Sequence, residues 1–224
     1  MNEGPKSRIR LKFARLAAAK DLSHLDQIKI LRGRAAACGL KFWPASGKAL
    51  SPKMAFGPAV SVGHESLCEY ADLYLEEFAR EEAAAEALRP LDDERFRLLS
   101  ARRIPVFFPS IEAAVNAAEF FLEGEFPAGF SDAAVDAFMA LKTCPFEKVK
   151  PSGERKQLDA RIPVLSASFD AQSALLKLTL RLAPGKNVKP ETAAALMAGG
   201  EPVFMRITRK ELYWLDSAGK LEVF

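Results

Sequence analysis

Cysteine and histidine are scarce in this chain of 224 residues. Its three cysteines, Cys38, Cys68 and Cys144, lie far apart and form no CxxC pair, and two histidines are too few for a typical Cys/His zinc site. An odd, sparse set of cysteines is typical of a reducing compartment, where thiols stay unpaired. We therefore expect neither a bound metal nor another cofactor.

Long hydrophobic runs and phosphate-binding glycine motifs are also missing. Charged residues interrupt every apolar stretch before it could span a bilayer, and residues 1–6 contain no apolar signal-peptide core. The chain contains no GxGxxG and no GKS or GKT sequence. We expect a cytoplasmic protein without membrane association. Its net charge of +3 allows a basic patch without requiring a nucleic-acid partner.

The composition, 49% hydrophobic and 27% charged, is that of a folded globular protein with room for one large or two small domains. Residues 8–13 alternate basic and apolar side chains with a period of two. This pattern predicts a half-buried strand whose apolar side chains face the core. The cations Arg8, Arg10 and Lys12 are then expected to point outward, as a solvated face or as a phosphate-binding stripe.

The stretch from Leu22 to Gly63 begins with a well-marked helix. Ser23 is a good N-cap, Asp26 takes the place of the acidic residue of a capping box, and Gly39 suits the position just after the helix. Apolar residues recur at helical spacing between these two ends. The sequence therefore predicts a strand followed by a helix at the start of the chain.

The rest of the first half alternates strands and helices. Residues 41–44, 69–75 and 96–103 read as strands, and the Ala/Glu-rich residues 78–88 predict a helix. The passage 45–52 is expected to be a loop. Together with the first strand and helix, these segments give the order β-α-β-β-α-β, which is that of a ferredoxin-like unit.

The second half repeats this order. Strands are predicted over 113–126, 157–164, 175–182, 203–208 and 211–215, helices over 131–141 and 190–197, and a polar loop over 150–156. We therefore predict an α+β protein built from two tandem ferredoxin-like halves with antiparallel sheets, covering residues 1–105 and 110–224.

Short motifs recur along most of the chain in a characteristic order. They are Ser23-His24-Leu25-Asp26, Gly47, Pro52-Lys53, Val62-Gly63, Glu65-Ser66, Glu69-Tyr70-Ala71-Asp72, Val115-Asn116-Ala117-Ala118-Glu119, Leu158-Asp159-Ala160-Arg161, Val188-Lys189-Pro190-Glu191 and Arg206-Ile207-Thr208-Arg209. In this order they resemble the radical-SAM-linked family of unknown function, whose members occur fused to, or beside, B12-binding radical SAM proteins. The resemblance implies a radical SAM protein as partner.

The chain also departs from that family. Where relatives usually read Gly-Phe-Asn-Pro-His-Pro, this chain has Gly-Lys-Ala-Leu-Ser-Pro over residues 47–52. No ligand role of that histidine carries over to Ser51. The chain has no CxxxCxxC cluster motif and so does not itself perform radical SAM chemistry.

Two sets of residues are candidates for function. His24 and Asp26 could form a general acid–base pair if the helix start lies in a cleft, although helix capping explains the same residues. Eight cations are candidates for RNA binding if they converge on one face near an aromatic residue such as Phe42, Trp43 or Tyr213, or else they are scattered solubility charges. These cations are Arg8, Arg10, Lys12, Lys48, Lys53, Lys177, Arg181 and Arg206.

The sequence therefore favours a non-catalytic accessory protein that works with a radical SAM enzyme and binds RNA or a protein substrate. Two alternatives stay open. One is an RNA-acting enzyme that uses His24, Asp26 and the loop over residues 45–53. The other is a protein-interaction module whose sheet faces pair with another chain.

Overall fold

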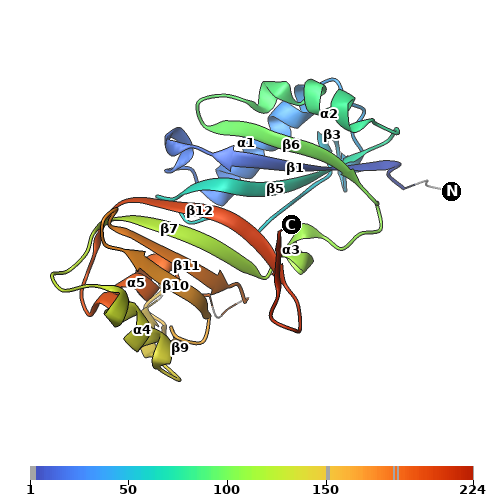
Figure 1. Cartoon of the computed structure of the whole chain (residues 1–224). Helices are drawn as coiled ribbons and strands as arrows, with labels where there is room; N and C mark the ends of the chain where they lie inside the picture. Colours follow the sequence, from blue (N-terminus) through green and yellow to red (C-terminus); the bar gives the residue numbers. More distant parts are fainter. Residues whose placement is uncertain (1–3, 150–151, 184, 186, 224) are drawn as a thin grey trace. The chain divides into compact units, whose positions relative to one another are not determined.

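The computed structural model describes residues 4–149, 152–183, 185 and 187–223, apart from the side chain of Lys48. The chain divides into two compact units, residues 1–115 and 116–224. Each unit combines helices with an antiparallel sheet, which confirms the predicted α+β class (Figure 1). Within the described residues, no helix is both long and apolar enough to cross a membrane.

The first unit contains a four-stranded sheet in the order β6-β1-β5-β4, in which every neighbouring pair is antiparallel. Its elements are β1 (Ser7–Arg15), η1 (Ala17–Ala19), α1 (His24–Ala37), β2 (Pro44–Ala45), β3 (Lys48–Pro52), β4 (Met54–Phe56), β5 (Glu65–Leu75), α2 (Glu81–Ala87), η2 (Arg89–Leu91), β6 (Phe96–Ile104) and α3 (Ile111–Ala114). The passage 45–52, expected to be a loop, instead forms most of the small hairpin β2–β3.

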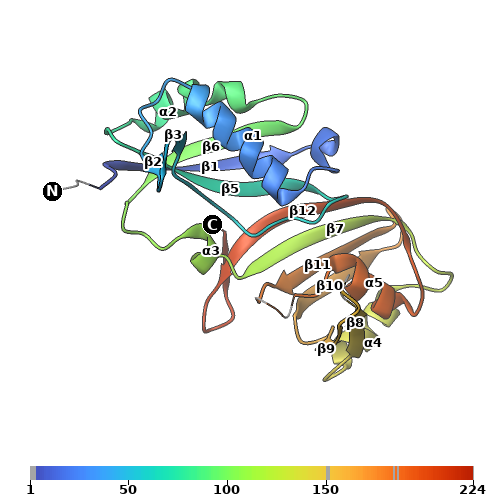
Figure 2. The same cartoon turned by 180° about the vertical axis from the view of Figure 1, so that it is seen from behind.

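The core of the first unit lies between this sheet and the helices α1 and α2 (Figure 2). Ile9, Leu11 and Phe13 of β1 are buried against Leu31 of α1 and Leu88 at the end of α2, so the apolar side of the first strand was predicted correctly. Burying an aliphatic or aromatic side chain of this size contributes about 1.5–3 kcal/mol.

A strap formed by residues 105–115 also belongs to the first unit. Its α3 contacts β4 and β5, and the Oγ of Ser110 caps this short helix by accepting the backbone N–H of Ala113 at 3.3 Å. The predicted strand over 113–126 was therefore wrong at its start. A capping serine before Ile111 starts a helical turn, and the strand begins only at Ala117.

The second unit contains a five-stranded antiparallel sheet in the order β10-β11-β7-β12-β13. Its elements are β7 (Ala117–Glu125), α4 (Asp132–Ala140), β8 (Pro145–Val149), β9 (Arg155–Asp159), β10 (Val164–Asp170), β11 (Leu175–Arg181), α5 (Pro190–Ala198), β12 (Val203–Leu215) and β13 (Leu221–Val223). Strands β8 and β9 form a separate hairpin.

Two strand predictions in the second unit need correction. Residues 157–164 do not form one strand, because Asp159 accepts the backbone N–H groups of Arg161 and Ile162 and turns the chain there. The strand that joins the main sheet starts at Val164. The two predicted strands over 203–208 and 211–215 are one continuous strand, β12, with bulges on its β7 side.

Glycine is required at one position of the second sheet. A Cβ on Gly124 of β7 would lie 2.2 Å from the carbonyl oxygen of Val203 and 2.8 Å from the Cα of Phe204 in β12. Backbone atoms cannot move aside as a flexible side chain can. The close approach of β7 and β12 beside their first bulge therefore depends on Gly124.

Candidate nucleic-acid interface

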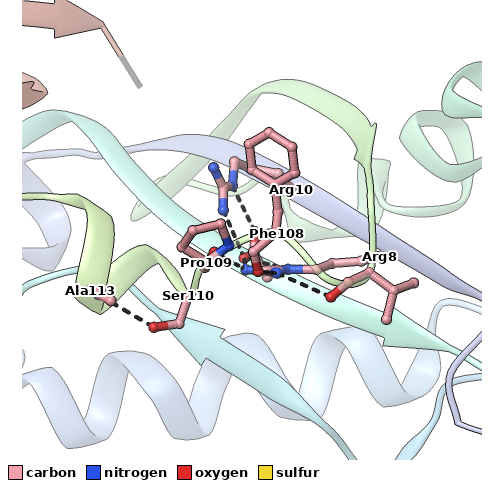
Figure 3. A network of polar contacts seen from close by, with 8 residues as sticks. Arg8, Arg10, Phe108, Pro109, Ser110 and Ala113 are labelled. Atoms are coloured by element: carbon pink, nitrogen blue, oxygen red, sulfur yellow. Dashed lines mark hydrogen bonds and ion pairs between the residues drawn. The ribbon is translucent and has the colours of Figure 1, made fainter.

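Each main sheet has an outer face that is not covered by the long helices, and the predicted RNA-binding cations were expected on these faces. In the first unit, Arg8 is only 1% exposed. Its Nε donates to Asp72 at 2.8 Å, and its Nη groups donate to the carbonyl oxygens of Phe108 at 2.5 Å and Pro109 at 2.9 Å (Figure 3). The prediction that Arg8 points to solvent and binds RNA was therefore wrong.

Arg10 shares the same carboxylate. Its Nε donates to Asp72 Oδ1 at 2.8 Å and its Nη2 to Oδ2 at 3.0 Å, leaving the arginine side chain 13% exposed. Asp72 lies directly opposite Arg10 in the pairing of β1 with β5, so the two side chains stand on the same face. A fully buried carboxylate requires such partners, because an unpaired buried charge is costly.

Two predicted lysines of the first unit, Lys12 and Lys53, lie over tyrosine rings. The Nζ of Lys12 is 5.4 Å from the ring centroid of Tyr70, and that of Lys53 is 4.7 Å from the centroid of Tyr74. Arg8 also lies over the ring of Tyr74, at 5.3 Å. Each of these cations therefore lies beside an aromatic ring of the same unit. The side chain of Lys48 lies outside the described part of the structure.

The outer face of the second unit has a different character. Phe121 of β7 lies near its centre, directly opposite Lys177 of β11 on one side and Thr208 of β12 on the other. The Nζ of Lys177 is 5.3 Å from the centroid of the Phe121 ring, and the Nζ of Lys210 is 4.9 Å from it. A half-buried aromatic ring thus has two ammonium groups above it.

Two further predicted cations stand on this face. Arg181 follows Lys177 by four residues on β11, has the same side orientation and is exposed. Arg206 lies opposite Glu123 of β7 and contacts both of its carboxylate oxygens at 2.8 Å. Three of the eight predicted cations therefore share one sheet face. We call the face formed by Phe121, Lys177, Arg181, Arg206 and Lys210 the platform.

Acidic side chains border the platform and are engaged by their neighbours. Glu123 pairs with Arg206, and Glu119 accepts a hydrogen bond from the hydroxyl of Tyr213 at 3.3 Å. The positive charge nearest to the Phe121 ring therefore comes from Lys177 and Lys210.

Sequence reasoning missed Phe121 and Lys210. The alternation in β7 places Phe120 and Leu122 in the core, so the opposite orientation of Phe121 could have been read from the same pattern. Lys210 was placed between two expected strands. A bulge between Arg209 and Glu211 brings Lys210 over the ring, and no period-two pattern predicts that position.

Comparison with known proteins assigns the family. The model of a family described as "Uncharacterized protein conserved in bacteria (DUF2344)" matches residues 8–190. The chain belongs to this family. The expected membership of a family of unknown function is thereby confirmed. A search of curated proteins found no match.

Among solved structures, a chain of the "Crystal Structure of a Cbf5-Nop10-Gar1 Complex" is similar to this DUF2344 member, with a TM-score of 0.45 and 6% sequence identity. The similarity covers 90% of this chain and 48% of that chain. This chain therefore spans about half the length of its structural neighbour.

The two predicted catalytic residues lie at the start of α1. The Oγ of Ser23 accepts the backbone N–H of Asp26 at 3.1 Å and donates to the carboxylate of Asp26 at 2.6 Å. The ring of His24 packs edge-on against Phe56, with the centroids 6.5 Å apart. These contacts confirm the predicted helix cap and give no further support to the enzymatic alternative.

The cysteines of this DUF2344 member are free thiols. Burial, followed by the negative charge of Asp159, raises the pKa of Cys144 above its ordinary value, which disfavours the nucleophilic thiolate. Among the residues that the structure describes, no group of three or more His, Cys, Asp and Glu side chains could hold a metal ion.

Proposed function

We propose that this DUF2344 member is a non-catalytic cytoplasmic accessory protein that binds single-stranded RNA on the platform of its second unit. The observation that carries the proposal is the Phe121 ring, which lies at the centre of a sheet face with Lys177 and Lys210 above it. Proteins that bind single strands combine an aromatic surface for base stacking with cations that contact the phosphates.

The order of strands supports this proposal. In both units the strands and helices follow β-α-β-β-α-β, with a hairpin inserted after the first helix. In both sheets the fourth strand of this order pairs with the first, the first with the third and the third with the second. We propose that both units are variants of the ferredoxin-like arrangement. Some RNA-binding four-stranded sheets stack bases on aromatics of their sheet face, and this fold-level analogy adds to the argument from Phe121.

The proposal is tested by titrating a fluorescently labelled single-stranded RNA of mixed sequence against the protein and measuring anisotropy. Replacing Phe121→Ala should weaken binding roughly 5- to 150-fold, since stacking on an aromatic side chain contributes about 1–3 kcal/mol per base. The matched control is Phe107→Ala, which removes an exposed phenylalanine from the strap of the first unit. Equal affinity of the wild type and the Phe121→Ala variant would contradict the proposal.

We also propose a radical SAM protein as the partner. The order of the short motifs from Ser23 to Arg209 supports this partner, because it resembles the radical-SAM-linked family. A surface feature adds to the support. Phe107 and Phe108 are 88% and 51% exposed on the strap, between two prolines and beside the carbonyl groups that Arg8 holds. Exposed aromatic residues on a fixed segment are typical anchors of protein–protein contacts.

Co-purification tests this partnership. The tagged chain is expressed with the radical SAM protein that accompanies it, and the amount recovered is compared with that for Phe107→Ser and Phe121→Ala. We expect Phe107→Ser to reduce recovery and Phe121→Ala to leave it unchanged. Absence of the radical SAM protein from the wild-type preparation would contradict the partnership without affecting the proposed RNA platform.

A further inference from the structure

A pocket of about 580 Å³ lies in the second unit where the platform ends at Arg181. It is bordered by β9, by the turn that contains Ile162 and Pro163, and by the end of β11. Its volume falls in the range of sites that bind small molecules, and every residue that lines it belongs to the second unit.

The pocket combines apolar walls with a few polar groups. Its apolar walls include Pro145, Leu158, Ile162 and Pro163. Arg181 and Lys156 supply positive charge, with the Nζ of Lys156 also donating to the carbonyl oxygen of Gly185 at 2.7 Å, and Asp159 supplies one negative charge. The amide of Gln157 can both donate and accept hydrogen bonds. Ile162 is 64% exposed, so its side chain is accessible to a ligand in the pocket.

Hydrogen bonds hold the walls in place. Asp159 accepts the backbone N–H of Arg161 at 2.8 Å and that of Ile162 at 3.0 Å, and the N–H of Arg181 donates to the carbonyl oxygen of Pro163 at 2.7 Å. The turn is thus tied both to β9 and to β11. A pocket with fixed walls loses little conformational entropy when a ligand enters.

These features together select the ligand class. Apolar walls favour a flat apolar surface, the Gln157 amide suits a ring edge with donors and acceptors, and the cations suit a phosphate. A free phosphate would use only the cations, and a neutral apolar molecule would leave them without a role. A nucleoside phosphate uses all three features.

The pocket and the platform share Arg181. Arg181 and Lys177 stand on the same face of β11, about 13 Å apart along the strand. A single strand whose base stacks on Phe121 can therefore follow β11 toward Arg181. We propose that the pocket lined by Ile162, Gln157 and Arg181 receives one nucleotide of the RNA that lies on the platform. This inference rests on the proposed RNA binding.

Two matched variants test the pocket. Ile162→Ser removes one of the four apolar side chains named above from the pocket wall. Val149→Ser makes the same kind of change at a 58% exposed valine on the neighbouring hairpin strand β8, which does not line the pocket. We expect Ile162→Ser to weaken RNA binding about fivefold or more, because less apolar surface is buried against the base, and Val149→Ser to leave it unchanged. Circular dichroism checks that both variants are folded.

Three outcomes separate this inference from the proposed function. If RNA binding depends on Phe121 but not on Ile162, the pocket assignment is wrong and the platform stands. If the wild type binds no RNA, the proposed function is wrong. A titration with uridine and adenosine 5′-monophosphates then tests whether the pocket binds a nucleotide. In that titration, saturable binding that Ile162→Ser weakens and that inorganic phosphate alone does not reproduce supports a nucleotide site, and absence of binding overturns it.

Discussion

The main sheets of the two units have related strand orders, but the cations on their outer faces have opposite roles. In the first unit, Arg8 and Arg10 converge on the fully buried Asp72, and the strap of residues 105–115 lies over Arg8. In the second unit, Lys177 and Lys210 lie over an aromatic ring, and the nearest ion pair, Arg206 with Glu123, is about half exposed. The first face uses its cations for stability, whereas the second presents them to solvent.

This difference shows that a strand carrying outward cations does not by itself indicate a binding surface. What decides is the set of groups that the folded unit brings around each cation. A carboxylate in the directly paired position of the next strand neutralises the cation, as Asp72 does for Arg10. An aromatic residue in that position does not decide the outcome, because Arg8 lies opposite Tyr74 and is buried, whereas Lys177 lies opposite Phe121 and is exposed.

The largest expected effect concerns the outer face of the first unit, where Asp72 neutralises Arg8 and Arg10. Asp72→Ala leaves the buried guanidinium of Arg8 without its carboxylate and should lower the free energy of unfolding by about 3–5 kcal/mol. Urea denaturation measures the change. The double variant Asp72→Leu with Arg8→Met removes the two fully buried charges, leaves only the partly exposed Arg10 without its carboxylate, and should be more stable than the single variant. A loss below about 1 kcal/mol in Asp72→Ala would contradict the interpretation that the cations of this face stabilise the first unit by pairing with Asp72.

An ion pair of intermediate burial extends this comparison. Burial alone would raise the pKa of Asp93, but hydrogen bonds from the side chain of Arg34, from the backbone N–H groups of Phe96 and Arg95 and from the side chain of Arg95 hold it well below its ordinary value. Asp93→Asn should therefore cost about 1–3 kcal/mol at pH 7.

The pH dependence of this loss has a defined sign. A lowered pKa in the folded state means that the stabilisation by Asp93 is complete above the unfolded-state pKa of about 3.9. It decreases as the pH falls below that value toward the pKa in the folded protein. Urea denaturation at several pH values should show the difference between wild type and Asp93→Asn shrinking below about pH 4. A difference that grows on acidification would contradict this assignment.

For the platform, we predict a specific dependence of RNA affinity on salt concentration. Lys177→Gln should reduce the slope of log affinity for single-stranded RNA against log salt concentration by about 0.7, because one phosphate contact is lost. This corresponds to roughly a threefold change in affinity between 50 and 200 mM salt. The matched control, Lys12→Gln on the face of the first unit, should leave the slope unchanged. Equal loss of slope in both variants would show that the cations act without regard to their position.

The smallest effect is expected at the exposed ion pair of the platform. Glu123→Ala should change the free energy of unfolding by about 0–1 kcal/mol, because both partners are accessible to water. It should also strengthen RNA binding slightly, since one negative charge leaves the platform. Denaturation and anisotropy titration test both points, and a stability loss comparable to that of Asp72→Ala would erase the contrast between the faces.

The fold was predictable where one local pattern dominates. The alternation in β1 correctly places Ile9, Leu11 and Phe13 in the core, and Ser23 caps α1 as predicted. Prediction failed where side chains interact with a local turn, as at Ser110 and Asp159, because a short helix or a tight turn interrupts an apolar run without changing its composition.

The candidate site was predictable only in part. Lys177, Arg181 and Arg206 were selected as basic residues on predicted strands, and they lie on one face. Phe121 was not selected. Its orientation follows from strand periodicity, but its place between β11 and β12 depends on strand pairing over distances of about 56 and 87 residues, taking the sequence separations of its partners Lys177 and Thr208.

By itself, the sequence determined the α+β class, the inward face of the first strand, the helix start at Ser23 and membership of the family. These features depend on periodicity, capping and motif order, all of which are local. Tertiary structure alone decided that Arg8 is buried beside Asp72 while Lys177 lies over Phe121. Both lysine and arginine read as solvent-facing in an alternating strand. Only the groups that distant parts of the chain bring to each cation, such as Asp72 and the strap carbonyls at Arg8, determine whether its charge is neutralised or presented.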